Sequence, residues 1–534
     1  MKVRYILSSV ALASLSLTSC SDLDTAPEGN IITSDKKGEI LEEMPERGLA
    51  GVRAIFQGMS AYEPNYEAFG KIERHNDIGY PSVLMFTDAN TEDVVSDPNG
   101  YNWNGNSLDY SDRTYTSYES QMVWNDHYNA IYVANTVIKG YNTGEDPTNE
   151  EARFFYAQGL AARAYFYFNL AQLYQFTYKG NETKACIPVV TDENTAKSQV
   201  EGTPCSTVEE TYTQIKSDID HAITLLEGSS YEREDKRYIS LAVAYGIRAR
   251  VNLVMQKWAD AASDAQKAID AAAAEGVTPA GIDDVKLPTF AKSTEKDWMW
   301  GILVAESDEV VQSGIVNWIS HCGTFNYGYG QYSKGRQINK KLYNKIPATD
   351  VRKGWWSGED KLNHFLPDKY NTYLKAKGFP AYTNCKFGTY DGNIGCNTNA
   401  NDIVLMRVEE MYLIKAEAMA KAGQDGKTEL ENFVKTYRDP SYTCKGDVQE
   451  AVYFQKRIEL WGEGMIWYDA MRLNKGVDRR GGGFPASAVF NIPANSPILL
   501  WRIPQTEINA NIALSDADND CRTEAAPKAV KDEE

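Results

Sequence analysis

The sequence predicts a mostly α-helical protein: a tetratricopeptide-like helical repeat scaffold with a loop-rich insertion that contains short strands. Three observations predict it. Long segments repeat apolar residues at helical spacing. Two alanine-rich segments flank a short turn, as in repeats whose small residues let antiparallel helices approach closely. Between the helical parts, residues 276–401 are dense in glycine, proline, asparagine and aromatics and lose the helical period.

The composition narrows the class of protein further. With 43% hydrophobic and 24% charged residues among 534, the chain is predicted to be globular rather than disordered or polytopic in a membrane. The net charge of −19 argues against nucleic-acid binding, which usually needs a basic face. The 33 tyrosines outnumber the 17 phenylalanines and 11 tryptophans together. Because tyrosine combines a flat apolar ring with a hydroxyl, this excess favours recognition of polar, hydrated ligands.

The first residues have the features of a secretory signal peptide. Lys2 and Arg4 precede a short apolar run, Ile6–Leu17, which is too short for a stable membrane span. Leu17-Thr18-Ser19-Cys20 then resembles a bacterial lipobox, in which Cys20 is acylated and becomes the mature N-terminus. The alternative is an ordinary signal with a coincidental cysteine. We therefore expect a lipid anchor on Cys20 that holds the mature protein on a membrane surface.

The charge and the remaining cysteines agree with an exported, lipid-anchored protein. Loss of Lys2 and Arg4 changes the net charge from −19 to −21, so electrostatic adsorption to anionic lipid is disfavoured and the lipid must anchor the chain. Seven cysteines follow Cys20, an odd number without a CxxC motif, which argues against a metal cage or redox motif. They are expected to be buried thiols, or to include a pair such as Cys385–Cys396.

We divide the chain by these signals into six parts. They are a signal peptide at 1–19, a lipidated tether at 20–40, a helical part at 41–275 with an aromatic loop near 97–106, a variable loop and strand part that binds ligand at 276–401, further repeat helices at 402–475, and a loop-rich C-terminal segment at 476–534.

Individual helices follow from local patterns. Ala157–Tyr174 carries small residues on one stripe and aromatics on others, as tight packing requires. Ser206 lies three residues before Glu209, which predicts a capping box at the start of an amphipathic helix. The two segments with repeat-like spacing are Arg237–Met255 and Trp258–Ala273. In that pair the repeat-like positions are Ala249, Trp258, Ala261 and Ala268.

Later segments complete the pattern. A further helix pair is predicted at Asp402–Ala422 and Asp447–Asn474. In the insertion, Trp298–Val304 is predicted as a buried strand, and loops follow it up to the Asn- and Gly-rich stretch Thr389–Asn401. The segment from Arg522 is polar and typical of a mobile chain end.

The sequence lacks the motifs of common catalytic sites. It has no HExxH, GxSxG, Walker or GxGxxG motif, and its five histidines are scattered. Adjacent acids such as Glu409-Glu410 do not face each other on a helix. Asp516–Asp520 alternates oxygen-bearing residues like a calcium loop but lacks the glycine and the late glutamate. We expect no catalytic residue, metal or cofactor, with a structural calcium ion as the alternative.

Aromatic residues in Asn- and Gly-rich loop segments are expected to be exposed and are the candidates for ligand binding. One group lies in the loop 97–106, one in Trp318–Tyr332, and one at Trp355-Trp356. Flat rings beside amides suit sugars, because the ring covers a pyranose face while amides bond its hydroxyls. The alternative is packing: Phe325, Tyr327 and Tyr329 alternate like one strand face, and the two tryptophans suit an amphipathic turn. The candidate glycan-binding residues are Tyr101, Trp103, Asn104, Trp318, Tyr327 and Tyr329.

Six stretches together resemble the SusD/RagB family of outer-membrane lipoproteins. They are Cys20–Pro27, Trp124–Val137, Ala157–Tyr174 with Ile187–Val190 after it, Asp402–Gly423, Arg457–Arg472 and Ile503–Asn511. Two places depart from the family pattern: Glu463-Gly464-Met465-Ile466 lacks the usual arginine, and Glu429–Arg438 replaces an Asn-containing repeat helix. Both concern packing.

The resemblance implies a function as well as a fold. Family members are surface lipoproteins of the outer membrane that cap a SusC-like TonB-dependent transporter with their helical repeats, bind glycans on an aromatic-rich side and are not enzymes. The family's binding places correspond here to Tyr101 and Trp103, and to Trp318, Tyr327 and Tyr329. The expected ligand is an oligo- or polysaccharide. The alternatives are a peptide, as in the RagB branch, a glycoside-cleaving enzyme with two carboxylates, or a scaffold that binds only proteins.

Overall fold

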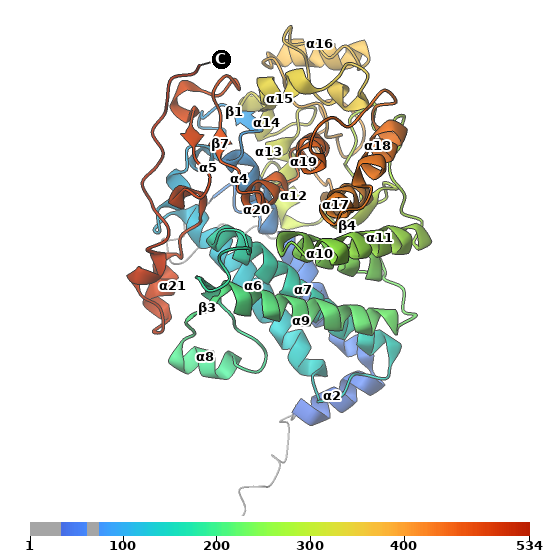
Figure 1. Cartoon of the computed structure of the whole chain (residues 1–534), viewed down its shortest axis with the longest axis vertical. Helices are drawn as coiled ribbons and strands as arrows, with labels where there is room; N and C mark the ends of the chain where they lie inside the picture. Colours follow the sequence, from blue (N-terminus) through green and yellow to red (C-terminus); the bar gives the residue numbers. More distant parts are fainter. Residues whose placement is uncertain (1–33, 61–73, 534) are drawn as a thin grey trace, which may run out of the picture.

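The computed structural model describes residues 34–60 and 74–533, and it is mostly helical (Figure 1). The signal peptide, Cys20 and most of the tether lie outside the described residues. The predicted fold class is confirmed. In the first half the helices are α2 (Ser34–Glu43), α3 (Leu49–Gln57), α4 (Tyr80–Asn90), α5 (Gly105–Leu108), α6 (Tyr118–Tyr141), α7 (Glu150–Tyr174), α8 (Thr195–Glu201), α9 (Val208–Glu227), α10 (Leu241–Val254) and α11 (Trp258–Ala274).

The second half alternates short and long helices. They are α12 (Glu309–Gln312), α13 (Trp318–Cys322), α14 (Tyr329–Tyr332), α15 (Lys340–Lys345), α16 (Asp368–Lys377), α17 (Val408–Lys421), α18 (Gly426–Tyr437), α19 (Val448–Glu459), α20 (Ile466–Arg472) and α21 (Gln505–Ala510). The strands form antiparallel pairs: β1 (Val94–Ser96) with β5 (Arg336–Ile338), β2 (Ala185–Pro188) with β3 (Cys205–Thr207), β4 (Trp298–Ile302) with β6 (Ile403–Arg407), and β7 (Val477–Asp478) with β8 (Asn491–Ile492).

Consecutive helices pack side by side as a repeat scaffold. Helix α7 packs on α6 and α9, α10 packs on α11, and α11 packs on α17, so the helices are stacked from the lower to the middle part of Figure 1. Three of the small residues predicted for the α10–α11 pair, Ala249, Ala261 and Ala268, are fully buried. Small side chains let these helices approach closely, which confirms the repeat-like pairing.

The capping box of α9 lies one residue later than predicted. Thr207, and not Ser206, is the N-cap: its Oγ1 accepts from the Glu210 backbone N–H at 3.2 Å, and its own N–H donates to Glu210 Oε2 at 2.7 Å. Both hydroxyl residues precede a glutamate by three positions, so the local pattern fits either. Pairing of β3 with β2 decides, because it holds the chain extended up to Thr207.

The predicted helix Asp402–Ala422 begins as a strand. Residues Ile403–Arg407 form β6 beside β4, and α17 starts only at Val408. The five residues of β6 are all buried, and a short apolar run does not distinguish a buried strand from a buried helix by its period. Similarly, the predicted helix Asp447–Asn474 is divided into α19 and α20.

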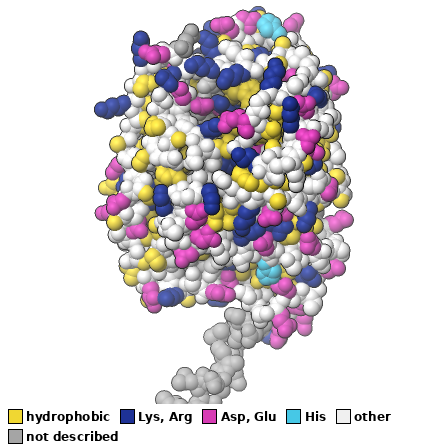
Figure 2. Space-filling model, viewed as in Figure 1, with side chains coloured by type: hydrophobic (Ala, Val, Ile, Leu, Met, Phe, Trp, Pro, Cys, Tyr) yellow, Lys and Arg dark blue, Asp and Glu magenta, His cyan; other side chains and the backbone are white. Residues whose placement is uncertain are grey.

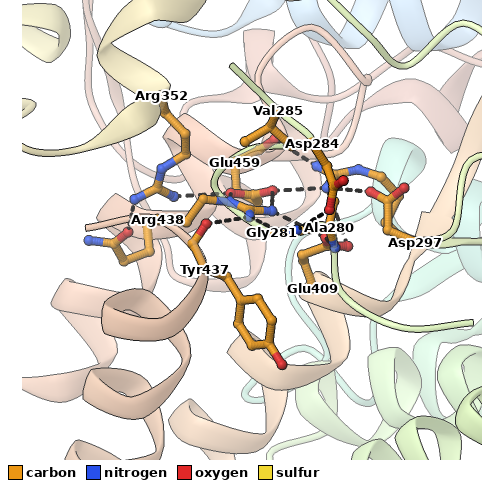
Figure 3. A network of polar contacts seen from close by, with 12 residues as sticks. Ala280, Gly281, Asp284, Val285, Asp297, Arg352, Glu409, Tyr437, Arg438 and Glu459 are labelled. Carbon is orange, nitrogen blue, oxygen red and sulfur yellow. Dashed lines mark hydrogen bonds and ion pairs between the residues drawn. The ribbon is translucent and has the colours of Figure 1, made fainter. Parts of the chain in front are cut away.

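A buried ionic network ties the repeat helices to the insertion (Figure 3). Glu459, at the end of α19, bonds Arg352 at 3.1 Å, Arg407 at 2.8 Å and Arg438 at 2.7 Å. Arg407 and Arg438 also reach Glu409 on α17, at 3.4 and 3.1 Å. Arg352 lies in the turn Val351–Trp355 of the insertion, so the network fixes that segment against the repeat helices.

The surface of the protein carries both positive and negative side chains. On the face shown in Figure 2, Lys and Arg are interspersed with Asp and Glu.

Asp88 on α4 is a buried acidic residue outside the ionic network. Its Oδ1 accepts the backbone N–H of Gly464 at 3.1 Å, and Arg336 Nη1 lies 3.9 Å from its Oδ2. Gly464 has φ +76°, and a Cβ there would lie 2.6 Å from Leu84 Cα, so glycine is required at this contact. Burial raises the pKa of Asp88 to about 7, although Arg336 opposes the rise.

We expect Asp88→Asn to change the pH dependence of stability. The folded protein keeps a proton on Asp88 that the unfolded chain loses between about pH 4 and pH 7, so this group's contribution to stability falls as the pH rises through that window. Asparagine stays neutral and keeps the acceptor for Gly464. Urea denaturation measures the free energy of unfolding of both proteins. The value for the variant minus that for wild type should increase by at least about 1 kcal/mol between about pH 5 and pH 8. A difference that is independent of pH would contradict the assignment.

Candidate functional site

The β1–β5 pair brings two aromatic segments together from distant parts of the chain. Its antiparallel register sets Ser96 opposite Arg336. The loop 97–106 leaves β1 at the same end at which the chain from α14 enters β5. Aromatic residues of both segments therefore meet beyond this end of the ladder.

Three exposed tyrosines meet there: Tyr101, Tyr327 and Tyr332, which we call the tyrosine cluster. The ring centroids of Tyr101 and Tyr332 are 5.4 Å apart with a 35° angle between the planes, and those of Tyr327 and Tyr332 are 6.0 Å apart at 90°. The side chains are 55%, 43% and 43% exposed. A hydrogen bond with Tyr327 raises the pKa of Tyr332 above its usual value, so the Tyr332 phenol is protonated at neutral pH.

The loop 97–106 is held by its own polar side chains. Asp97 Oδ1 accepts from the Asn99 N–H at 3.0 Å, and Asn99 Oδ1 accepts from the Tyr101 N–H at 2.9 Å. Asn102 donates to Ser96 Oγ at 3.0 Å. These local bonds are typical of Asx turns and fix the backbone that carries Tyr101.

Two of the predicted binding residues lie beneath the cluster. Trp103 is half-buried, and Tyr329 is 5% exposed, with 6.2 Å between their ring centroids. His75 packs against both rings, at 4.6 and 5.8 Å. His321 stacks on Tyr329 at 4.8 Å, and burial lowers the His321 pKa to about 3, so this imidazole is neutral. These four rings pack on one another, and Trp103 and Tyr329 are each two residues along the chain from a member of the tyrosine cluster.

Two other predicted binding residues, Trp318 and Asn104, are buried. Trp318 is 3% exposed, lies at the start of α13 and packs edge-on against Phe387 at 5.0 Å, so the expectation of an exposed loop residue is wrong. Asn104 is also 3% exposed, and its side-chain nitrogen lies 3.9 Å from the Met85 sulfur. The Asn- and Gly-rich sequence around both residues predicts exposed side chains. In the folded protein, packing against other segments of the chain buries both.

The packing alternative holds for the tryptophan pair. Trp355 and Trp356 are 1% and 0% exposed, and Trp355 donates its indole N–H to the Val285 carbonyl at 2.9 Å. The strand-face alternative for the Phe325–Tyr329 alternation fails, since Phe325 and Tyr329 are buried and Tyr327 between them is exposed.

Tyr332 is the member of the cluster that the sequence did not single out. The segment Trp318–Tyr332 is a predicted binding segment, but its sequence does not reveal the helical spacing of Tyr329 and Tyr332. This is because α14 is a single helical turn of four residues, Tyr329–Tyr332. The turn carries Tyr329 inward and Tyr332 outward. Its neighbour Tyr101 is more than two hundred residues away in the chain, so only the fold reveals the contact.

Other groups of chemical interest are accounted for by packing. The carboxylates of Glu409, Glu459 and Asp297 are enclosed and paired with arginines, so they are inaccessible to a polysaccharide. Among the described residues, no group of three or more histidines, cysteines and acids is arranged to hold a metal ion. The cysteines after Cys20, including Cys385 and Cys396, are free thiols. In the part of the chain that the structure covers, no helix is long and apolar enough to cross a membrane.

Comparison with known protein families assigns the chain. Residues 79–253 match a SusD-like family model described as starch-binding and associating with the outer membrane, and residues 324–519 match the SusD family model. The chain belongs to the SusD family. The two matches together span well over half of its length and include both segments that form the tyrosine cluster.

Several solved SusD-like structures share the fold of this SusD-family protein. A SusD-like carbohydrate-binding protein of Bacteroides vulgatus aligns with a TM-score of 0.71 at 22% identity, covering 88% of this chain and 97% of the other. A SusD superfamily protein of Bacteroides thetaiotaomicron aligns with a TM-score of 0.67 at 20% identity, over 87% and 98%. Surface glycan-binding protein A of the same organism, in complex with laminarihexaose, gives 0.60 at 17%, over 88% and 98%.

One curated relative matches in sequence over a short region. A SusD-like protein of Formosa agariphila is 29% identical over 102 residues, which is 17% of this chain and 20% of that protein. The chain thus matches about a fifth of that relative's length.

Proposed function

We propose that this SusD-family protein captures oligo- or polysaccharide at the cell surface, with the tyrosine cluster as a contact surface. The observation that carries the proposal is the convergence of three exposed rings from distant segments on a loop held by its own hydrogen bonds. Tyrosine rings cover apolar sugar faces, their hydroxyls bond sugar hydroxyls, and few side-chain torsions are frozen on binding.

The relatives support the glycan class of ligand. The structural neighbour with laminarihexaose binds a glucan, and the first matching family model is described as starch-binding. The carboxylates of the ionic network are buried and paired with arginines, so these particular acids are unavailable to hydrolyse a glycan.

We further propose lipid anchoring through Cys20 and delivery of the glycan to a SusC-like TonB-dependent transporter. Residues 20–33 connect Cys20 to α2, a reach of at most about 50 Å. Helix α2 lies at the lower end of Figure 1, and α14 lies in the upper half. Capture at the cluster raises the occupancy of glycan above the transporter, and a lid-like movement of the bound protein then admits it.

Calorimetry on the chain from Ser21 onward tests the proposed function. The panel contains neutral and acidic polysaccharides together with mixed peptides. Heat of binding with at least one glycan is expected. Binding of peptides alone would favour the RagB-like alternative, and release of reducing ends would indicate an enzyme.

Replacement of Trp103 by alanine should weaken glycan binding moderately. Its ring packs on His75 and Tyr329, and Trp103 is two residues from Tyr101 and Tyr329 two residues from Tyr327, so loss of the ring should loosen the segments that carry the cluster; such aromatic contacts are worth about 0.5–1.5 kcal/mol each. Retention in a polysaccharide-containing gel should therefore indicate a loss of affinity of about two- to tenfold. Unchanged retention would show that Trp103 does not contribute to the site.

A further inference from the structure

A pocket adjoins the tyrosine cluster on the other side of the segment 325–327. Its volume is about 290 Å³, at the lower limit of small-molecule sites, so it suits one or two sugar units. Phe325 and Tyr370 lie in its wall and are buried, with ring centroids 4.9 Å apart. Tyr390 and the exposed Lys292 and Asp391 line it as well.

The backbone links this pocket directly to the cluster. The Tyr327 N–H donates to the Cys396 carbonyl at 2.7 Å, and the Gly395 N–H donates to the Phe325 carbonyl at 2.7 Å. The segment 325–327 is thus paired with the loop 388–396. Phe325 in the pocket and Tyr327 in the cluster are two residues apart, so their Cα atoms are separated by at most about 7 Å.

A further aromatic side chain lies between the two places. The ring of Tyr373 is 6.1 Å from that of Phe325, and its hydroxyl donates to Gln331 Oε1 at 3.4 Å, next to Tyr332. Tyr373 therefore connects the pocket wall at Phe325 with α14, the helical turn that carries Tyr332.

The polar groups of the pocket suit hydroxyl-bearing sugars. Asp391 accepts from the Asn393 N–H at 2.9 Å and from its side-chain amide at 3.1 Å. These bonds orient an ionised carboxylate that has acceptor sites left for sugar hydroxyls. Lys292 Nζ lies 4.8 Å from the centre of the Tyr390 ring and adds donors beside it.

We infer that the pocket is a second glycan subsite, and that one neutral oligosaccharide occupies the pocket and the tyrosine cluster together. This rests on the proposed function and extends it to a chain-length requirement. Neutral sugars are favoured over polyanions because the protein carries a net charge of −19 and the charged residues that line the pocket are two acids, Glu295 and Asp391, against one lysine, Lys292.

The test uses the mature chain and neutral oligosaccharides, from dimers to hexamers, of the malto-, laminari-, xylo- and manno- series, with oligogalacturonides as the acidic series. Wild type should bind a neutral hexamer at least about tenfold more tightly than its dimer. Tyr390→Ala and Lys292→Ala should each remove most of this advantage. Both side chains are at the surface of the pocket, and the matched control is Tyr132→Ala, an exposed tyrosine on α6.

The outcomes separate the inference from the proposed function. Hexamer binding that is unchanged in both pocket variants would overturn the second subsite and leave glycan capture standing. Tighter binding of oligogalacturonides than of every neutral series would overturn the assignment to neutral sugars. If wild type binds none of these oligosaccharides and none of the polysaccharides, glycan capture fails and the subsite fails with it.

Discussion

Replacing Glu459 by alanine is expected to lower the free energy of unfolding by about 3–5 kcal/mol. The carboxylate contacts three arginines, Arg352, Arg407 and Arg438, and all four side chains are fully buried. Figure 3 shows Glu459 with Arg352 and Arg438. Without this carboxylate, three guanidinium groups share the remaining acids, and buried charge is left without compensation. Urea denaturation monitored by tryptophan fluorescence measures the loss.

The control is an ion pair on the protein surface, exposed to solvent. Glu201 on α8 lies 3.6 Å from Lys197, and the two side chains are 64% and 72% exposed, so Glu201→Ala should change stability by less than about 1 kcal/mol. A Glu459 variant no less stable than this control would contradict the role of the network.

The pH dependence of the Glu459 contribution has a definite sign. Burial by itself raises its pKa, but Arg438, Arg407 and Arg352 hold the pKa well below the ordinary value. The contribution is therefore present above about pH 4.5 and is lost as the pH falls through the folded-state pKa. Wild type and variant should converge in stability under strongly acidic conditions.

The double substitution Tyr101→Ala, Tyr332→Ala is expected to weaken glycan binding by about ten- to a hundredfold. It removes two of the three exposed rings of the cluster, which contact each other at 5.4 Å. Stacking on each ring contributes roughly 1 kcal/mol or more to the binding free energy, and about 1.4 kcal/mol corresponds to a tenfold change in the dissociation constant. Titration calorimetry with the best ligand of the panel measures the change.

Two controls give this result a specific meaning. Tyr332→Phe keeps the ring and removes its hydrogen bond with Tyr327, so it separates stacking from hydroxyl contacts. Tyr132→Ala removes a 58% exposed tyrosine from α6 and should leave affinity unchanged. Full affinity in the double variant would show that the ligand binds elsewhere.

Much of the helical scaffold was predictable because its signals are local. The alanine spacing of the α10–α11 pair and the hydroxyl–glutamate pattern before α9 depend on residues within a few turns of each other. The prediction failed where two local solutions were equivalent. Ile403–Arg407 is apolar enough for strand or helix, and only its pairing with β4 decides.

The candidate site was predictable only in part. Asparagine and glycine around Tyr101 indicated an exposed loop, and the structure agrees. The same reasoning failed for Trp318 and Asn104, because residues remote in sequence bury them: Phe387 covers the first and Met85 the second. Exposure depends on the whole fold and cannot be read from neighbours in the chain.

The sequence alone determined the helical class, the acidic charge, the predicted lipid anchor and the resemblance to the SusD/RagB family, since each depends on composition or short motifs. The tertiary structure decided which aromatics form a surface. It joined Tyr101 to Tyr332 through the β1–β5 ladder and linked Tyr327 to the pocket through the pairing of 325–327 with 395–396. Such contacts join residues far apart in the chain, and they exist only when backbone pairing and core packing are complete.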